Sequence, residues 1–412
     1  MKTVFLIMPN VFPLPDMKGG GIERLMTILI EENGKYGRIR LVFTSPYDEE
    51  AVEHQYKNAK IYYFNDNYLC DDKNKRFIDK KWKYYCGIQR IKRIKQMFFN
   101  NRITSKVFGL PKPKMSHYLF QCYWISKIEQ AEVVVIERLP ITEDIIPFKS
   151  VVGEENIYYH VHYHIEEQIA GRKILPNSIS ISNFIKQQWA KDKSINGKNE
   201  VLYNCINVSD FAKKISSEKK LQLRKELGLS HNDFVVLFCG RFMPQKGVLE
   251  LLEAFSTIDN KKIKLLLIGS AYYSLSIETD YSRKVIETSK KMENVVYPGY
   301  IPNNKLPDYY AIADAQAVPS TCQEGAGLVV LEGMASGLPL IITDSGGMIE
   351  YVNDDCAIKV PIDENLSDNL RKAIIQLENQ PDLCQRMSQA GRERSKIFDT
   401  KNYYENFLDI IN

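Results

Sequence analysis

Short apolar runs alternate with segments of helical periodicity along this chain, and the alternation starts twice. The run Val4–Met8 predicts a strand, and a helix face with the i, i+3, i+4, i+7 spacing begins at Ile22. The pattern restarts at Phe234–Cys239, which is followed by a helix face that begins at Val248. Such alternation predicts βαβ units and a parallel sheet that helices cover on both faces. The sequence therefore predicts two α/β halves, joined around residues 185–230.

The same kind of apolar run predicts the remaining strands. In the first half they are Leu41–Phe43, Ile61–Phe64, Val133–Ile136 and Ile157–Val161. In the second half they are Ile263–Ile268, Val295–Tyr297, Ala315–Val318, Pro339–Thr343 and Ala357–Val360. Residues 367–412 are expected to form helices that break near Pro381 and Asp399.

Length and composition exclude several classes of protein. A chain of 412 residues is long enough for two or three domains of ordinary size. Its 44% hydrophobic and 26% charged content is that of a globular protein, so intrinsic disorder, a collagen-like chain and a coiled coil are excluded. The 55 basic and 51 acidic side chains give a net charge of +4, which is too balanced to indicate a partner for the whole chain.

The cysteines and the apolar runs indicate a compartment. The eight Cys are dispersed and there are only six His, so neither a disulfide scaffold nor a structural zinc site is expected. Dispersed thiols are typical of a reducing compartment. The N-terminal apolar run is too short for the core of a signal peptide, and no run approaches the ~18–20 apolar residues of a membrane span. We expect a cytoplasmic protein without a transmembrane helix.

Residues 73–114 differ from the rest of the chain, because they hold 14 Lys or Arg and a single acid, Asp79. Aromatic and aliphatic side chains are interleaved with the cations, in the pattern of a basic amphipathic helix. Such a helix can lie on an anionic membrane surface, at the cytoplasmic face of a membrane. The alternative is a solvated helix whose apolar side packs on its own domain. Nucleic-acid binding is not expected, because no motif for it accompanies the cations.

The strongest candidate site is a pair of carboxylates, Glu324 and Glu332, which lie eight residues apart. Glu324 precedes a Gly-rich turn, and Glu332 is expected two turns into the helix that follows. Gly residues at a helix start let backbone N–H groups approach an anion, which the helix dipole also favours. The spacing suits a sugar nucleotide, with one acid for sugar hydroxyls and the other for the ribose diol.

A second candidate is the segment Gly240–Gly247, which directly follows a predicted strand. Open α/β sheets bind ligands at the carboxyl ends of their strands. Arg241 and Lys246 lie five residues apart, so the Arg fork and the Lys point charge can both reach one diphosphate. A basic surface loop is the alternative, and the Gly-rich helix start elsewhere in the same half favours the diphosphate site.

Two segments of the first half add candidates. Gly19–Gly21 lies between the first predicted strand and helix and permits close approach of a ligand, the alternative being a flexible loop. It does not match G-x-G-x-x-G, which disfavours a nicotinamide-dependent dehydrogenase. His160, His162 and His164 alternate along a strand end, which places them on one face. We interpret them as lining a cleft, and a metal site is not expected because no further His or Cys cluster supports it.

These motifs together resemble those of the GT-B glycosyltransferases, and specifically those of the retaining glycosyltransferase family 4. The resemblance spans nearly the whole chain and is densest over Val235–Val352. Glu324 and Glu332 match the E-x7-E motif of that family. Gly240–Gly247 is similar to its diphosphate-binding strand end and loop, and Val296–Ile301 is similar to the stretch that borders the nucleotide base.

The resemblance implies a fold and its boundaries. GT-B proteins have two facing Rossmann-like domains with a cleft between them, and their last helix crosses back to the N-terminal domain. We expect an acceptor-side domain at residues 1–205, a nucleotide-sugar-binding domain at 206–394, and a crossing helix at about 395–412. Asn204–Ile206 resembles the interdomain Asn-Gly segment of the family, with Cys205 in place of the usual Gly.

The resemblance also implies a role for each matched residue. Arg241 and Lys246 would hold the donor diphosphate and stabilise the leaving group. Glu324 would contact the hydroxyls of the donor sugar, and Glu332 would bind the ribose hydroxyls. The other donor-binding positions that it implies are Gly20, Gly21, Tyr300, Ile301, Gly325, Ala326, Gly327 and Leu328.

The chemistry of the family accounts for the lack of an obvious general base. Retaining members are thought to use front-face attack, in which the leaving phosphate accepts the proton of the acceptor while fixed cations stabilise the developing charge. The family places a His near the donor sugar, which corresponds here to His162, with His160 and His164 as alternatives. No metal and no cofactor beyond the nucleotide-sugar co-substrate is implied, because no D-x-D motif with apolar flanks is present.

The sequence therefore predicts a metal-independent hexosyltransferase that moves sugar from a nucleotide sugar, preferably a UDP-sugar, to a glycan or lipid-linked glycan in polysaccharide or glycoconjugate biosynthesis. Two alternatives remain, a sugar-nucleotide epimerase on the same fold and a non-catalytic GT-B partner subunit. The presence of Arg241, Lys246, Glu324 and Glu332 together favours the transferase.

Overall fold

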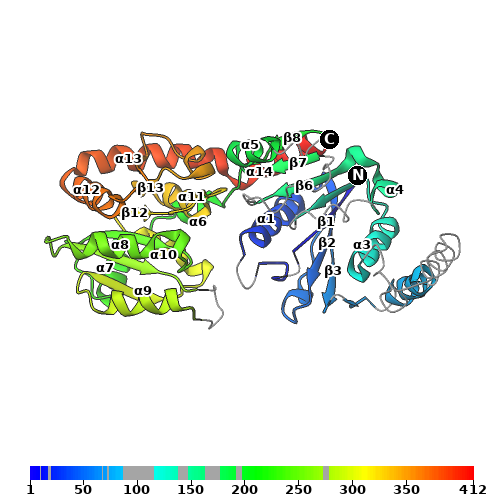
Figure 1. Ribbon diagram of the computed structural model, residues 1–412, viewed down its shortest axis with the longest axis horizontal. Coiled ribbons are helices and arrows are strands. Elements are labelled where there is room, and N and C mark those ends of the chain that lie inside the picture. Colours follow the sequence, from blue (N-terminus) through cyan, green and yellow to red (C-terminus); the bar gives the residue numbers. More distant parts are fainter. Residues whose placement is uncertain are drawn as a thin grey trace, which may run out of the picture.

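The computed structural model describes residues 1–9, 11–16, 20–66, 68–71, 74–86, 116–137, 147–162, 177–191, 197–271 and 278–412. Within these ranges the chain forms two α/β domains that lie side by side (Figure 1). We call the half with the eight-stranded sheet the N-domain and the half with the six-stranded sheet the C-domain.

The N-domain sheet has the order β4-β3-β2-β1-β5-β6-β7-β8, and its neighbouring strands are parallel except for β3 and β4. The strands are β1 (Lys2–Ile7), β2 (Ile39–Pro46), β3 (Ala59–Asn65), β4 (Tyr68–Leu69), β5 (Val133–Ile136), β6 (Ile157–Val161), β7 (Asn177–Ser180) and β8 (Asn199–Val201). The helices include α1 (Gly21–Tyr36), α3 (His117–Ile128), α4 (Lys149–Val152) and α5 (Asn183–Lys191), and residues 74–86 are also helical.

The C-domain sheet has the order β11-β10-β9-β12-β13-β14 and is parallel throughout. The strands are β9 (Phe234–Cys239), β10 (Ile263–Ile268), β11 (Val295–Gly299), β12 (Ala315–Val318), β13 (Leu340–Thr343) and β14 (Ala357–Val360). The helices of this domain are α6 (Val208–Ala212), α7 (Ser217–Glu226), α8 (Val248–Ser256), α9 (Asp280–Lys290), α10 (Leu306–Ile312), α11 (Leu328–Ser336), α12 (Leu366–Asn379) and α13 (Pro381–Ser395). The last helix of the chain is α14 (Thr400–Ile411).

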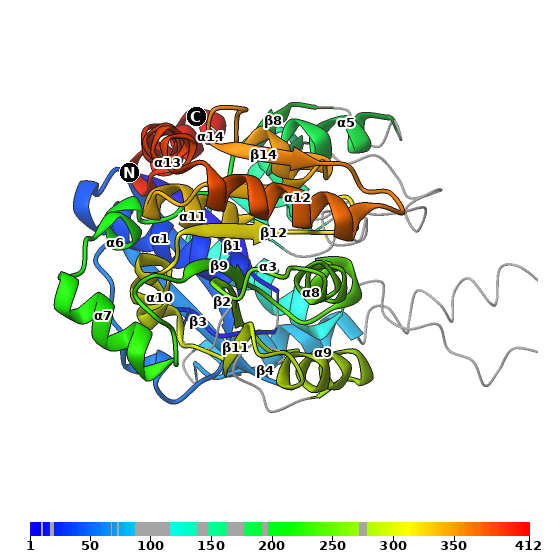
Figure 2. The same ribbon diagram turned by 90° about the vertical axis from the view of Figure 1, so that its left-hand side faces the viewer.

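Each sheet is buried on both faces, because alternate side chains of its central strands enter different cores. In β1, Val4 and Leu6 pack with α1 and α14, whereas Phe5 and Ile7 pack on the opposite face with α3. In the C-domain, α6, α10 and α11 cover one face of the sheet, and α8, α9 and α12 cover the other (Figure 2). This double coverage explains why the strands read as continuous apolar runs.

The last helix, α14, leaves the C-domain and packs on the N-domain (Figure 1). Lys2 Nζ donates a hydrogen bond to the carbonyl of Ile411 at 2.8 Å. Tyr404 O–H, from the middle of the helix, donates to Asn33 Oδ1 in α1 at 2.8 Å. The predicted GT-B arrangement, with its crossing C-terminal helix, is therefore confirmed.

A second contact joins the domains near this crossing. Glu350, at the end of the short helix Gly346–Glu350 of the C-domain, accepts the backbone N–H groups of Asn183 and Phe184 at 2.8 and 2.6 Å. These N–H groups open α5, so the carboxylate completes the unsatisfied start of a helix in the other domain. The hydroxyl of Tyr203 donates to the same carboxylate at 2.9 Å.

All the strands predicted from apolar runs overlap strands of the structure, but β4, β7 and β8 were missed. The last two are short and polar, and each is held by side-chain hydrogen bonds as well as by the sheet. Ser178 Oγ, for example, donates to Asn199 Oδ1 at 2.8 Å while being fully buried. Such strands lack the apolar signal that periodicity detects.

Within the described ranges, no helix combines the length and the apolar content that a membrane span requires.

Candidate active site in the cleft between the domains

A cavity of about 1170 Å³ lies between the two domains, and both contribute to its walls. The N-domain contributes the start of α1 and the end of β6, and the C-domain contributes the segments that follow β9, β10 and β12. The strand order of the C-domain reverses direction at β9, so the cavity lies at the topological switch point where open α/β sheets bind ligands.

The segment after β9 places two cations at this cavity. Arg241 and Lys246 both line it, and Lys246 Nζ lies 2.6 Å from Glu324 Oε1. The turn between Lys246 and α8 requires a Gly, because Gly247 has φ of 65° and a Cβ there would lie 1.8 Å from the carbonyl oxygen of Pro319. The backbone therefore holds Lys246 against the segment that carries Glu324.

The segment Glu324–Leu328 lies beside Lys246 on the C-domain side of the cavity and ends at the start of α11. The N–H of Glu324 donates to Ser345 Oγ at 3.0 Å, and its carbonyl accepts the N–H of Gly347 at 2.7 Å. Ser320 Oγ donates to the Glu324 carboxylate at 2.7 Å. The positive end of the α11 dipole and its unsatisfied N–H groups thus face the cavity beside Lys246, which suits an anion.

Glu332 lies deeper in the cavity, with its side chain 5% exposed. The hydroxyl of Tyr310 donates to Glu332 Oε2 at 2.8 Å, and Arg24 Nη1 lies 3.2 Å from Glu332 Oε1. Burial raises the pKa of Tyr310 well above its ordinary value, so this hydroxyl remains a donor. The prediction that Glu332 lies two turns into its helix is wrong: α11 begins at Leu328, so Glu332 lies just past the first turn, which keeps it near the cavity.

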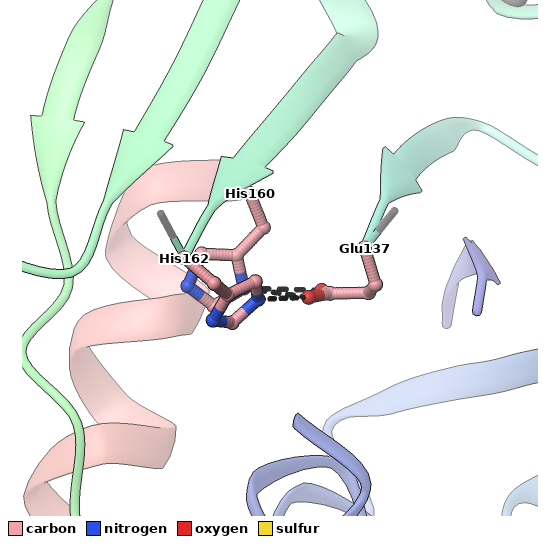
Figure 3. A group of neighbouring side chains, drawn as sticks. All are labelled: Glu137, His160 and His162. Atoms are coloured by element: carbon pink, nitrogen blue, oxygen red, sulfur yellow. Dashed lines mark hydrogen bonds and ion pairs between the residues drawn. The ribbon is translucent and has the colours of Figure 1, made fainter. Parts of the chain in front are cut away.

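A buried cluster of Glu137, His160 and His162 stands at the N-domain edge of the cavity (Figure 3). Glu137 follows β5, His160 belongs to β6, and both rings point toward the Glu137 carboxylate. His160 Nδ1 and His162 Nε2 lie 2.9 and 2.8 Å from Glu137 Oε2. Of the three side chains, only that of His162 lines the cavity.

The charges of this cluster follow from its burial. Burial alone would raise the pKa of Glu137, but the charge and hydrogen bond of His160 and the hydrogen bond of His162 outweigh it and lower the pKa to about 2. Burial, together with His160, lowers the pKa of His162 to about 4. At neutral pH Glu137 is therefore a carboxylate, and His162 is a neutral ring that donates its Nε2–H to it.

The donor set of this cluster fits a hydrogen-bonded network better than a metal centre. One nitrogen of each ring and a carboxylate oxygen lie within 4.8 Å of one another, so three metal ligands are geometrically available. A metal-bound imidazole carries its proton on the other nitrogen and passes it to an acceptor. His160 Nε2 is buried with no hydrogen-bond partner among the described residues. Metal binding at Nδ1 would therefore leave a buried N–H unsatisfied.

The structure brings the predicted residues to one place. The cavity wall contains Gly20, Gly21, His162, Arg241, Lys246, Tyr300, Ile301, Glu324, Gly325, Ala326, Gly327, Leu328 and Glu332. His160 lies behind the wall, 2% exposed, and His164 lies outside the described residues.

The sequence analysis assigned no role to two residues of the site. Arg24 lines the cavity from the first turn of α1, and its only signal was its position next to the Gly-rich segment. Glu137 directly follows an apolar strand, where a polar side chain at the carboxyl end of a parallel sheet could have been noticed. Neither has a motif of its own, because each acts through a partner that is distant in sequence.

The basic segment at 73–114 is described only in part, since residues 73 and 87–114 lie outside the described ranges. The helix at 74–86 packs its aromatic side on its own domain. Trp82 and Tyr85 lie 5.0 and 5.3 Å from Phe120 of α3, centroid to centroid. Lys80, Lys83 and Tyr84 of the same helix are exposed.

Comparison with known proteins supports a glycosyltransferase with the GT-B fold. Residues 219–394, which include the C-domain sheet, match the family described as glycosyl transferases group 1. Among solved structures, a glycosyltransferase from Rickettsia africae has a TM-score of 0.74 at 16% identity and covers 100% of this chain and 97% of that one. HepE from Anabaena, in complex with UDP, has a TM-score of 0.70 at 17% identity, covering 100% and 99%. The chain has the GT-B fold.

Curated relatives match parts of the chain. The lipopolysaccharide 1,2-N-acetylglucosaminetransferase of Salmonella typhimurium is 33% identical over 136 residues, which are 32% of this chain and 36% of that protein. A GDP-mannose-dependent phosphatidylinositol monomannoside mannosyltransferase of Mycobacterium tuberculosis is 30% identical over 182 residues, 42% and 46% of the two chains. The putative glycosyltransferase EpsD of Bacillus subtilis is 26% identical over 208 residues, 50% and 52%. The matches thus span about half the length of these relatives or less.

Proposed function

We propose that this protein is a retaining glycosyltransferase of family 4 that transfers a hexose from a UDP-sugar to a glycan or lipid-linked glycan acceptor. One observation carries the proposal. In a single cavity, Arg241, the Lys246–Glu324 pair and the start of α11 surround the space that a diphosphate and its sugar would occupy. The names of the relatives, which act in lipopolysaccharide and phosphatidylinositol mannoside synthesis, support a role in polysaccharide or glycoconjugate biosynthesis.

The Lys246–Glu324 pair is suited to an exchange of partners on donor binding. In the free protein each side chain neutralises the other, at 2.6 Å. A donor phosphate would take over Lys246 and join Arg241 and the N–H groups of α11 around the diphosphate. Glu324 would then be available to accept hydroxyls of the donor sugar, while Ser320 keeps its carboxylate in place. The cation is thus preorganised for charge that develops on the leaving diphosphate.

The N-domain would supply the other side of the reacting sugar. Gly20 and Gly21 allow the donor and acceptor to approach the start of α1 closely. His162 presents a neutral ring at the same wall, held by Glu137. A neutral ring near the sugar adds no charge that would oppose an oxocarbenium-like transition state. In this account the leaving phosphate accepts the acceptor proton, and no metal takes part.

The test is thermal stabilisation by a panel of nucleotides and nucleotide sugars, without added metal. A ligand that binds only the folded state raises the melting temperature by mass action. We expect UDP and one UDP-sugar to raise it, and GDP and NAD to leave it unchanged. A rise in melting temperature with GDP alone would indicate a GDP-sugar donor in place of a UDP-sugar. If no nucleotide raises the melting temperature, the alternative of a non-catalytic GT-B subunit is favoured.

A peripheral contact with an anionic membrane through residues 73–114 completes the proposal. It is supported by the 14 cations of this segment and by the lipid-linked chemistry named for one relative. Within the helix at 74–86, Lys80 and Lys83 are exposed, whereas Trp82 and Tyr85 pack on Phe120.

A further inference from the structure

Glu332 is held from both domains at once. Tyr310, from its own domain, donates to Oε2 at 2.8 Å, and Arg24, from the N-domain, lies 3.2 Å from Oε1. Arg24 and Glu332 are 308 residues apart in sequence, and the side chain of Arg24 is 21% exposed against 5% for Glu332. This ion pair therefore crosses the cleft inside the cavity, where water screens it less than at the surface.

Arg24 touches the C-domain at a second point. Its Cζ lies 5.8 Å from the centroid of the Phe211 ring, within the range of a cation–π contact. Phe211 belongs to α6, is 2% exposed, and stacks edge-on with Tyr310 at 5.3 Å. The guanidinium thus docks on a C-domain cluster of Phe211, Tyr310 and Glu332 and is not simply adjacent to one carboxylate.

The backbone of Arg24 connects it to the Gly-rich segment at the cavity. Its N–H closes the first turn of α1 on the carbonyl of Gly20 at 3.1 Å. The side chain therefore starts directly beside Gly20 and Gly21, which line the same cavity. A shift of Gly20 and Gly21 would move Arg24 and would therefore change the distance between Arg24 and Glu332.

The carboxylate retains capacity for a ligand. Two carboxylate oxygens offer about four acceptor positions, of which Tyr310 and Arg24 use two. A vicinal diol donates two hydrogen bonds, which matches the remaining positions. A ribose diol can therefore join Glu332 without displacing Arg24, and its arrival excludes water and strengthens the ion pair.

We propose that Arg24 is a positioning residue that clamps the N-domain over the nucleoside of the donor, acting through Glu332. The inference rests on the proposed function, since it takes the ligand of Glu332 to be the ribose of a nucleotide sugar. Closure by Arg24 and donor binding then favour each other, as linkage requires of two events that stabilise the same state.

The variants that test this are Arg24→Gln and Arg24→Lys, with Tyr310→Phe and Arg283→Gln as controls. Tyr310→Phe removes a hydrogen bond to the same carboxylate from within the C-domain, so it disturbs Glu332 without touching the interdomain contact. Arg283 is exposed and pairs only with Asp280 of its own helix among the contacts described for it. Thermal melting and circular dichroism establish that each variant is folded.

Two measurements separate the clamp from a local effect. Donor KM and kcat are measured first, and we expect Arg24→Gln to raise KM about 10-fold with kcat within about 3-fold, and Arg24→Lys to recover part of this. Hydrogen exchange of the free protein is measured second. We expect faster exchange at the start of α1 and in α6 for Arg24→Gln only, because the clamp acts without ligand. Arg283→Gln should leave both readouts unchanged.

The outcomes that overturn the inference are distinct from failure of the proposed function. If wild-type protein binds no nucleotide sugar, the proposed function fails, and the clamp over a nucleoside fails with it. If wild type binds the donor but Arg24→Gln binds it as tightly or more tightly, the donor displaces Arg24 and the clamp alone is wrong. If Arg24→Gln and Tyr310→Phe change KM and exchange alike, Arg24 only orients Glu332 and does not clamp the domains.

Discussion

The two domains meet the same cavity with different chemistry. The C-domain contributes Arg241, Lys246, two carboxylates and the start of α11, a strongly charged surface suited to a phosphorylated ligand. The N-domain contributes a Gly-rich segment, one arginine and a neutral histidine held by a buried carboxylate. In the proposed transferase the C-domain would bind and activate the donor, and the N-domain would shape and close the space in which transfer occurs.

This contrast predicts that C-domain substitutions affect turnover and that N-domain substitutions affect stability and closure. The largest effect is expected for Lys246→Ala. It removes a preorganised cation from the leaving diphosphate, and loss of one such group typically costs 10²–10³-fold in kcat. Because Lys246 is 27% exposed, the variant should remain folded. Initial rates with the donor identified by thermal shift provide the measurement. A loss below about 5-fold would contradict the role given to Lys246.

The next largest effect is expected for Glu137→Gln, as a loss of stability. The folded pKa values of His162 and Glu137, about 4 and about 2, lie below the ordinary values of 6.5 and 4.5. The unfolded chain therefore binds more protons than the folded protein once the pH falls below about 6.5. The free energy of unfolding of wild type therefore falls as the pH is lowered.

Glu137→Gln should cost about 3 kcal/mol at pH 7, since it leaves two buried rings without a charged acceptor. The deficit should shrink below pH 4.5, where wild type begins to lose the contribution of its carboxylate on the way to the folded pKa of about 2. Urea unfolding at pH 7, 5 and 3.5 checks both statements. A deficit that is constant over this range would contradict the pKa assignment.

A smaller effect is expected for the double substitution Lys80→Gln and Lys83→Gln in the exposed side of the helix at 74–86. Each lysine near an anionic surface contributes about 1 kcal/mol, so the loss of both should weaken binding to vesicles with anionic lipid about 30-fold. Co-sedimentation with anionic and neutral vesicles provides the measurement, and turnover on a soluble acceptor provides the control. Equal binding of wild type to both vesicles would remove the membrane contact from the proposal.

The smallest effect is expected at Glu23, which is 4% exposed beside Gly20. Burial raises the pKa of Glu23 to about 7, so the folded protein holds a proton that the unfolded chain has lost above pH 4.5. Stability should therefore fall as the pH rises from 4.5 through 7. Glu23→Gln mimics the protonated form and should gain about 1 kcal/mol at pH 8 with no gain at pH 5. Melting curves of wild type and Glu23→Gln at pH 5 and pH 8 provide the measurement. An equal change in melting temperature at both pH values would contradict the raised pKa of Glu23.

The same contrast between the domains explains what the sequence could and could not predict. The C-domain site lies in two contiguous stretches, Gly240–Gly247 and Glu324–Glu332, so motif spacing was enough to find it. The N-domain site is assembled from Arg24, Glu137 and His162, which no short pattern connects. Their proximity depends on the order of β1, β5 and β6 in the sheet, which periodicity does not reveal.

The sequence analysis missed strands β7 and β8 for a related reason. Apolar runs identified the central strands, whose side chains enter two cores. Strand β7 and the edge strand β8 are built on Ser178, Ser180 and Asn199, which are satisfied by hydrogen bonds to one another. Local sequence cannot distinguish such a strand from a polar loop, because the partners that stabilise it come from another segment.

The central claim is that the C-domain side of the cleft binds a nucleoside diphosphate. Calorimetric titration of UDP into wild type and into Lys246→Ala, without metal, tests it most directly. The account predicts saturable binding at one site per chain, weakened at least about 10-fold by the substitution, because a charge-assisted contact to phosphate is lost. Binding that is absent in wild type, or unchanged in the variant, would contradict it.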